Sequence, residues 1–382
     1  GLAGVSFCRL LLQATYVALV VLSFYATAQY VAYTPTLLHD MHLNALTLVL
    51  IVTPAAAGVT VALFLLKPLL ARPGKQAEPL ELDAAAEPAL FAFVTRLCRV
   101  LGAPVPERVF VDLQVNASAS FHREWRGLLR GRLTLTIGLP LVAGINIHQF
   151  AGILAHEFGH FSQRAGMRLI FLIVTIRNWF ARVAQERDSW DAWLDSGRED
   201  GTWHLKIILG VAALTVYLSR LILRGLLWVA DLLTAWFSRQ MEFDADRRAA
   251  ALVGGAAARN TLLKLPLLEA ASQSALARLN RSWSEQRLTD DFPYLVYRQE
   301  AQFDDGLRQH ITEATLEAAT GFWDRHPSTA GRATNVQNIA GVFVATTPDA
   351  EAPARKLFTD FAALARRATR FHFENTLGEK FA

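Results

Sequence analysis

The chain has 382 residues, enough for two or three domains, and 52% of them are hydrophobic while only 19% are charged. This balance is more apolar than that of an ordinary soluble enzyme and indicates that part of the chain avoids water. The formal net charge is only +4. No basic run is interleaved with aromatic residues, so we expect no nucleic-acid partner. The two cysteines, Cys8 and Cys98, form no C-x-x-C motif and no disulfide framework.

Two long uncharged runs dominate residues 1–70. They cover residues 10–38 and 43–66, and each exceeds the about 20 residues that cross a bilayer core. A cleaved signal peptide is the alternative for the first run, because Arg9 precedes it and an A-x-A triplet occurs at residues 26–28. A second run follows at once, however, so the sequence predicts two transmembrane helices.

Residues 167–237 hold two further apolar stretches, 167–183 and 207–237, on either side of an acidic loop. Both are weaker candidates for membrane spans, because charge inside a bilayer is costly. Arg177 interrupts the first stretch, and the second contains Arg220, Arg224 and Asp231. Buried helices of a globular domain are therefore the alternative reading of this region.

The distribution of Lys and Arg predicts an orientation. The short connection at residues 39–44 contains neither, whereas Lys67, Arg72 and Lys75 follow the second run. Positive residues favour the cytoplasmic side of a membrane. We therefore expect an integral membrane protein, in a bacterial inner membrane, with the lipid bilayer as a partner and the catalytic domain in the cytoplasm.

Residues 71–166 read as the first part of a soluble domain. Residues 87–101 predict a helix that Gly102 closes, and residues rich in β-branched side chains predict short strands at 108–113, 115–121 and 132–137. Asn146 is a candidate cap for the next helix, with Gln149 as its capping-box partner. The fold class expected here is mainly α with a small β-sheet.

That next helix carries an H-E-x-x-H motif at residues 156–160. His156 and His160 fall on one helical face, about 6 Å apart along the axis, where both imidazoles can reach one zinc ion. Glu157 lies beside that metal and can take a proton from the attacking water, the arrangement of a metallopeptidase. His148 points away from this face and is expected at the surface.

A catalytic zinc takes three protein ligands and leaves one position open, so a third ligand is needed. The position that supplies a third histidine in metzincins is Gly166, which excludes that class. Glu186 and Glu199 lie in the acidic loop, which the predicted topology places across the membrane. Glu242 is the better candidate.

Glu242 is followed four residues later by Asp246, so both share one helical face. Glu242 can bind the metal while Asp246 orients a ligand imidazole, as partners of zinc histidines commonly do. A solvated acidic helix face paired with Arg247 and Arg248 is the alternative. Residues 238–382 read as helical, with boundaries at residues 254–255 and at His326-Pro327, which from sequence alone is a turn.

The chain resembles the integral-membrane gluzincin metallopeptidases, the group of HtpX-like and CAAX prenyl proteases. The resemblance covers most of residues 1–335 and rests on four motifs in the family's order. They are Asn116-Ala117-Ser118-Ala119, the H-E-x-x-H at 156–160, Glu242 with Asp246, and His326-Pro327 with Arg332. Ser118 stands where HtpX-like proteins usually carry an aromatic residue, and the chain after Asn335 matches no motif of the family.

The resemblance implies a substrate site and a mechanism. Residues Asn116, Ala117, Ser118 and Ala119 would form an edge strand that pairs with a polypeptide substrate. His326 or Arg332 would stabilise the oxyanion of the reaction. One Zn²⁺ ion would be held by His156, His160 and Glu242.

These inferences combine into one expectation of fold and function. The fold is expected to be that of a multi-span membrane protein carrying a gluzincin-type zinc metallopeptidase domain, divided at residues 1–70, 71–166, 167–237 and 238–382. The function is expected to be zinc-dependent endopeptidase activity on exposed or misfolded polypeptides. The alternative is a catalytically silent zinc-binding membrane adaptor that binds a protein partner.

Overall fold

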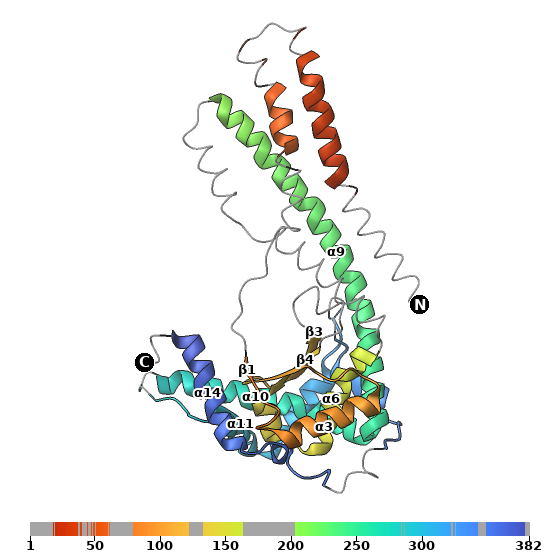
Figure 1. The fold of residues 1–382 in the computed structure, drawn as a ribbon, viewed down its shortest axis with the longest axis vertical. Coiled ribbons are helices and arrows are strands. Elements are labelled where there is room, and N and C mark those ends of the chain that lie inside the picture. Colours follow the sequence, from red (N-terminus) through yellow and green to blue (C-terminus); the bar gives the residue numbers. More distant parts are fainter. Residues whose placement is uncertain are drawn as a thin grey trace. The chain divides into compact units, whose positions relative to one another are not determined.

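The structure, a computed structural model, divides into two compact units (Figure 1). One contains Gly1–Gly74 and Leu169–Phe237, and the other contains Lys75–Arg168 and Ser238–Ala382. We call them unit 1 and unit 2. The structure describes residues 18, 20–36, 39, 44, 47, 49, 51–59, 61, 79–121, 133–162, 203–283, 285, 287–321, 324, 326–342 and 349–378.

Unit 1 is helical where it is described. Residues 20–36 and 51–59 are continuous helix. The helix α9, Trp203–Val253, begins in unit 1 and ends in unit 2. Tyr30 Oη donates a hydrogen bond to Ile51 O at 3.1 Å, which joins the first two helical segments.

The prediction of a multi-span membrane protein is wrong for the described residues, because none of their helices is both long and apolar enough to cross a membrane. Arg220, Arg224 and Asp231 interrupt the apolar stretch of α9. The predicted third span, 167–183, lies outside the described residues.

Unit 2 is built on a four-stranded sheet with the order β1-β2-β4-β3. The strands are β1 (Leu80–Glu81), β2 (Arg108–Asp112), β3 (Ala117–Phe121) and β4 (Leu133–Gly138). β2 and β4 are parallel, whereas β3 runs antiparallel to β4, with Ala117 opposite Ile137. The three predicted strands are confirmed, and β3 lies at an edge of the sheet.

Helices make up the rest of unit 2, and Figure 1 shows α3, α6, α10 and α11 below the sheet. The helical elements after β1 are α3 (Pro88–Leu101), α5 (Leu139–Gly144), α6 (Ile147–Ser162), α10 (Gly255–Trp283), α11 (Phe292–Ala301), α12 (Asp305–Glu317), α13 (Thr329–Val336), the 3₁₀ turn η2 (Ala354–Leu357) and α14 (Phe361–Leu377). The expectation of a mainly helical chain with a small sheet is confirmed.

Local sequence signals set three helix boundaries that position the site. Gly102 ends α3 with a φ of 65°, and Gly254 separates α9 from α10 with a φ of 90°. Both are left-handed conformations that glycine adopts at low cost. Gln149 N donates to Asn146 Oδ1 at 2.7 Å, and Asn146 N donates to Gln149 Oε1 at 3.1 Å. The predicted capping box therefore begins α6.

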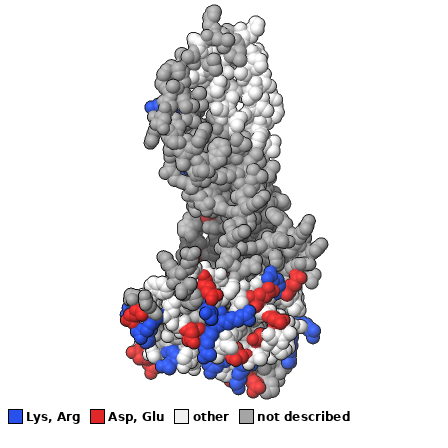
Figure 2. Space-filling view, turned by 60° about the vertical axis from the view of Figure 1, so that its left-hand side comes forward, with Lys and Arg blue, Asp and Glu red and all other residues white. Residues whose placement is uncertain are grey.

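The sheet and α6 both contribute to the core of unit 2. Phe150, Leu154 and Phe158 of α6 and Leu135 and Ile137 of β4 are completely buried. Packing of this kind fixes the rotation of α6 about its axis, so the opposite face of the helix has a set direction. Figure 2 shows charges of both signs interspersed over the visible surface of unit 2, as suits a solvated surface.

Candidate metal centre

Helix α6 carries the three charged or metal-binding residues of the H-E-x-x-H motif. The rings of His156 and His160 lie 4.9 Å apart between centroids and nearly perpendicular, at 86°. The two side chains are only 14% and 16% exposed. Four-residue spacing on a helix therefore brings the two imidazoles together, as the sequence predicts.

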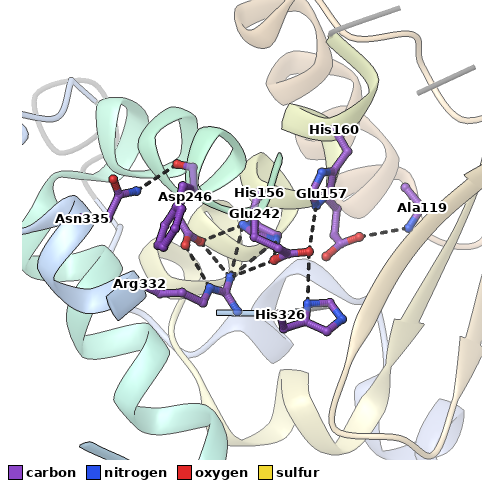
Figure 3. Close-up of polar contacts among 10 residues, drawn as sticks. Ala119, His156, Glu157, His160, Glu242, Asp246, His326, Arg332 and Asn335 are labelled. Carbon is purple, nitrogen blue, oxygen red and sulfur yellow. Dashed lines mark hydrogen bonds and ion pairs between the residues drawn. The ribbon is translucent and has the colours of Figure 1, made fainter. Parts of the chain in front are cut away.

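The third group comes from α9. Glu242 Oε2 lies 3.3 Å from His156 Nε2, and Glu242 Oε1 lies 3.8 Å from His160 Nε2 (Figure 3). One nitrogen of each imidazole and one carboxylate oxygen all fall within 4.8 Å of one another. Ligands about 2.0–2.1 Å from a tetrahedral ion are separated by about 3.4 Å. The arrangement is therefore a candidate site for one metal ion.

The bonding of the donor atoms fits a cation. Glu242 is 6% exposed, and its Oε2 atom is buried without a hydrogen bond. Among the described residues other than His156, Arg332 Nη2 lies near this oxygen, at 3.6 Å. A buried carboxylate oxygen that accepts no hydrogen bond is costly to bury unless a cation satisfies it. The residues present therefore suit a divalent ion.

Asp246 contacts Nδ1 of His156, the ring nitrogen that does not face Glu242. Its Oδ1 atom lies 2.9 Å from His156 Nδ1, and Asp246 is only 3% exposed. A hydrogen bond from Nδ1 leaves Nε2 of the ring free to bind the metal. Asp246 thus occupies the orienting position that the E-x-x-x-D spacing predicts.

Arg332 of α13 binds Asp246 with two hydrogen bonds. Its Nη2 donates to Oδ1 at 2.7 Å and its Nε donates to Oδ2 at 2.9 Å (Figure 3). The same Nη2 atom lies 3.4 Å from His156 Nδ1. This fork and its position against the ring lock the guanidinium beside the ligand helix.

These contacts shift the acid–base properties of the site. Burial lowers the pKa of His156, but the nearby carboxylates of Asp246 and Glu242 outweigh it and raise the pKa to about 9. Burial lowers the pKa of His160 to about 4. Burial raises the pKa of Glu242, yet the nearby rings of His156 and His326 dominate and hold this pKa far below its ordinary value. The cluster therefore favours an ionised carboxylate beside a neutral His160.

Glu157 lies between the metal ligands and the edge of the sheet. Its Oε2 atom accepts a hydrogen bond from Ala119 N at 3.3 Å. Burial raises the pKa of this carboxyl, although the charge of His156 and the Ala119 hydrogen bond act against it. A buried carboxyl with a raised pKa is suited to take up a proton in a reaction.

The edge strand β3 directs backbone groups away from the sheet on this side. Gly138 N donates to Asn116 O at 2.8 Å, so Asn116 and its alternate neighbour Ser118 direct their backbone groups toward β4. Ala117 and Ala119 then direct theirs away from β4, and Ala119 N reaches Glu157. Asn116, Ala117 and Ser118 also line the cavity at the site.

His326 lies at the open side of the cluster. Its Nδ1 atom lies 3.1 Å from Glu242 Oε1, and its side chain is 71% exposed. The hydrogen bond with Glu242 raises the pKa of His326. The structure thus brings together every residue that the sequence nominates for the site, from α6, α9, β3, α13 and the segment before α13.

The sequence does not predict the role of Asn335 at the site. Asn335 Nδ2 donates to Phe243 O at 2.9 Å and Asn335 Oδ1 accepts from Arg247 Nε at 3.1 Å, and these two hydrogen bonds join α13 to α9.

The expectation that His148 lies at the surface is wrong. His148 is 6% exposed, and its Nε2 atom lies 2.8 Å from Val253 O. It does point away from the metal residues, but the end of α9 covers it.

Comparisons with known proteins agree with this geometry. The model of Peptidase family M48 matches residues 85–340. Protease HtpX of Chromohalobacter salexigens is 31% identical over 216 residues, which are 55% of this chain and 66% of that protein. Protease HtpX of Acinetobacter baylyi is 30% identical over 185 residues, which are 47% of this chain and 56% of that protein.

The matched parts leave a share of each relative uncovered, since the chain spans less than two thirds of either curated protein. No solved structure matches the chain. The matched range of the family model includes both motif histidines, Glu242 and Arg332. The predicted resemblance to HtpX-like gluzincin metallopeptidases is confirmed.

Proposed function

Because the chain belongs to Peptidase family M48, we propose that it is a zinc-dependent metalloendopeptidase that hydrolyses peptide bonds in exposed or misfolded polypeptides. The observation that carries this proposal is the convergence of His156, His160 and Glu242 beside Glu157. The donor set of two imidazoles and one carboxylate is typical of catalytic zinc, which keeps its fourth position open.

The metal would be held by His156, His160 and Glu242. Zinc, when bound, would supply Lewis-acid polarisation of the peptide carbonyl and a nucleophile at neutral pH. Asp246 would keep Nδ1 of His156 protonated, so that Nε2 faces the ion. Glu157 would accept the proton of the attacking water and pass it to the leaving amine.

The two candidates for oxyanion stabilisation, Arg332 and His326, differ in their exposure and in the contacts that they already make. Arg332 already donates two hydrogen bonds to Asp246, and its side chain is 18% exposed. His326 is exposed at the open side and contacts Glu242 there. We therefore assign the oxyanion role to His326 and a positioning role to Arg332.

The substrate would lie as an extended strand on the outward backbone groups of β3, by β-augmentation. This mode reads the peptide backbone and not a particular sequence, which suits exposed or misfolded polypeptides. It also requires the edge of β3 to be open to the site, and Asn116, Ala117 and Ser118 line that cavity.

We also propose a location at a membrane, with unit 2 on the cytoplasmic side. The proposal rests on the 52% hydrophobic composition and on the placement of Lys and Arg in the N-terminal part. Leu221, Trp228 and Trp236 of α9 are each more than half exposed. Sedimentation of the protein with membranes would support this location, and its recovery in the supernatant would contradict it. Protease should digest unit 2 only after the cytoplasmic face of the membrane is made accessible.

A substitution of Glu157 tests the enzymatic proposal. We expect Glu157→Gln to keep its zinc and to lose about 10²–10⁴-fold in cleavage of a reduced and alkylated, permanently unfolded protein, because Gln cannot accept the proton. Bound zinc and cleavage rate are measured on the same preparations. Glu269→Gln, on the exposed side of α10, is the matched control and should cleave normally. Unchanged cleavage by Glu157→Gln contradicts the proposal, and full zinc without cleavage by the wild type indicates the silent adaptor.

A further inference from the structure

A second cavity in unit 2 lies apart from the metal residues. It encloses about 350 Å³, a size that suits a small molecule. Its described lining residues come from α10, α12 and α13 and its C-terminal cap, and they all belong to unit 2. None of these residues belongs to the metal cluster or lines the cavity at the metal centre. We call it the second cavity, and the chemistry of the metal centre gives it no role.

Helix α13 stands between the second cavity and the metal centre. Arg332 and Asn335 lie on the side of α13 that contacts α9, where they bind Asp246 and the carbonyl oxygen of Phe243. The residues that α13 and its C-terminal cap contribute to the second cavity are Ala330, Ala333, Thr334 and Gln337. Each residue turns a helix by about 100°, so this set lies on one side and Arg332 and Asn335 lie on the other. One short helix therefore contacts both sites.

Helix α10 is shared in the same way. On one side it contributes to the cavity at the metal centre the residues Ala258, Thr261, Leu262 and Leu265. On the other side it contributes to the second cavity the residues Ala256, Arg259 and Asn260. The same angular spacing separates these two sets. A ligand in the second cavity would therefore touch two helices that also contact the metal centre.

The side chains of the second cavity favour an anion. Arg259 is partly buried, and no carboxylate among the described residues forms an ion pair with it. In the part of the chain that the structure describes, none of the lining residues is acidic, and Asn260 and Gln337 add uncharged amide donors. A guanidinium that is partly removed from water is stabilised by an anionic partner, and its planar fork matches the two oxygens of a carboxylate. The cavity therefore suits a group with one negative charge.

We propose that the second cavity binds a small carboxylate ligand and that this ligand strengthens metal binding through α13. The ligand is a free organic acid or the C-terminal carboxylate of a short peptide, which share the same charged group. Leu316 of α12 and Ala333 of α13 supply apolar surface in the same cavity for the rest of the ligand. The carboxylate site stands on the residues of the second cavity alone, whereas its effect on the metal rests on the proposed function.

The link between the two sites is a chain of contacts that begins on α13. Arg332 binds the carboxylate of Asp246, and Asp246 Oδ1 lies 2.9 Å from Nδ1 of His156. With only eight residues, α13 is too short to be stable by itself and depends on packing. A carboxylate held by Arg259 between α10 and α13 would favour the packed position of α13, and hence the orientation of His156. Zinc would in turn raise the affinity for the carboxylate by the same factor.

Binding to the metal-free, full-length protein tests the site itself. Butyrate represents a free acid and acetyl-dialanine represents a peptide C-terminus, and each is compared with its own amide by isothermal titration calorimetry. We expect an acid to bind at least about tenfold more tightly than its amide, because the amide lacks the charge that Arg259 would pair. Absence of binding by both acids, amides that bind as tightly as the acids, or inorganic phosphate that binds more tightly than either acid would overturn the proposal.

Two variants locate the bound acid. Arg259→Gln removes the charge and should weaken binding about tenfold or more. Ala330→Leu changes no charge but fills the cavity with a larger side chain, and it should prevent binding. Arg278→Gln is the control, because Arg278 lies on the same helix, is exposed and does not line the second cavity. Equal affinities for the wild type, Arg259→Gln and Ala330→Leu would place the acid elsewhere and overturn the site.

Zinc affinity tests the coupling between the two sites. It is measured by competition with a chelator, with and without a saturating amount of the acid. We expect the acid to raise the zinc affinity of the wild type about fivefold or more and to leave that of Arg259→Gln unchanged. The comparison with Arg259→Gln also removes any direct binding of zinc by the acid.

The outcomes separate this proposal from the proposed function. Binding of the acid at Arg259 with no change in zinc affinity would overturn the coupling and leave the peptidase standing. Failure of the wild type to bind zinc, while Arg259→Gln still loses the acid, would support the carboxylate site and refute the metallopeptidase.

Discussion

The two ring nitrogens of His156 face two different carboxylates. Nδ1 faces Asp246 at 2.9 Å and Nε2 faces Glu242 at 3.3 Å. Because Glu242 faces the nitrogen that would bind the metal, Asp246 is left to set the tautomer and the direction of the ring. Arg332 then balances the buried charge of Asp246 with a pair of hydrogen bonds.

Asp246→Asn should weaken metal binding without removing a ligand. Asn keeps the shape of Asp246 but loses the charge that holds Nδ1–H, so we expect zinc affinity to fall about 10- to 100-fold. The affinity is measured by competition with a chelator of known strength. Asp244→Asn is the control, because Asp244 is partly exposed and pairs with Arg247 on the same helix. Equal affinities for the two variants would refute the orienting role.

Residues that share one helical face can be predicted well from the sequence, whereas the burial of a single side chain cannot. The four-residue spacings of His156 with His160 and of Glu242 with Asp246 fix which residues share a helical face, and the structure places both pairs so. The burial of His148 depends on Val253, more than a hundred residues later. No local pattern carries that contact.

Among the helices of unit 2, one buried acidic residue joins three elements. Glu300 at the end of α11 is 5% exposed, and its Oε1 atom lies 3.0 Å from Lys264 Nζ of α10. Arg308 of α12 also pairs with Glu300 and donates to its carbonyl oxygen at 2.6 Å. This cluster fixes α10, which carries one wall of the cavity.

Glu300→Gln should lower the free energy of unfolding by about 2 kcal/mol at pH 7, because it leaves two cations partly buried without their anion. Burial raises the pKa of Glu300, but Lys264 and Arg308 lower it below the ordinary value of 4.5. A lowered pKa in the folded state stabilises the protein above pH 4.5, and this contribution is lost as the pH falls through the folded pKa. The difference between variant and wild type should therefore shrink below pH 4.5.

Urea unfolding at pH 7 and at successively lower pH measures this difference. Glu374→Gln is the control, because Glu374 forms an exposed pair with Arg370 one helical turn away. Such pairs contribute about 0.5 kcal/mol or less. A Glu300→Gln effect that is as small as the control, or that grows below pH 4.5, would contradict the assignment.

Element boundaries were predictable where a residue type enforces them. Gly102, Gly254 and the Asn146–Gln149 capping box mark helix ends in the sequence, and the structure places helix ends there. The two units divide between Phe237 and Ser238, where the sequence predicts a division, although α9 runs through this position and continues to Val253. Composition changes there from apolar to polar, but no glycine or proline stops the helix.

The whole molecule separates into two units, and the sequence predicts the structure of the two units by different signals. The core of unit 2 comes from residues scattered between Leu82 and Ala368, including the C-terminal helix α14, which matches no motif of the family. Long apolar runs led instead to a multi-span prediction that the described helices contradict.

Cys98 in this core gives a probe of global opening. It is completely buried, and burial raises the pKa of its thiol to about 12. At pH 8 roughly one thiol in ten thousand is then the reactive thiolate. In a Cys8→Ser background we expect iodoacetamide to leave the native protein unlabelled and to label it fully in urea, as mass spectrometry would show. Rapid labelling without urea would mean that the core around Cys98 opens readily.

The position of the metal ion tests the central assignment most directly. X-ray data collected at the zinc absorption edge from crystals of the metal-loaded protein locate the ion independently of any assay. We predict one anomalous peak about 2.0–2.2 Å from Nε2 of His156, from a ring nitrogen of His160 and from a carboxylate oxygen of Glu242. A peak elsewhere, or one at the two histidines with Glu242 turned away and no other carboxylate in its place, would contradict the assignment.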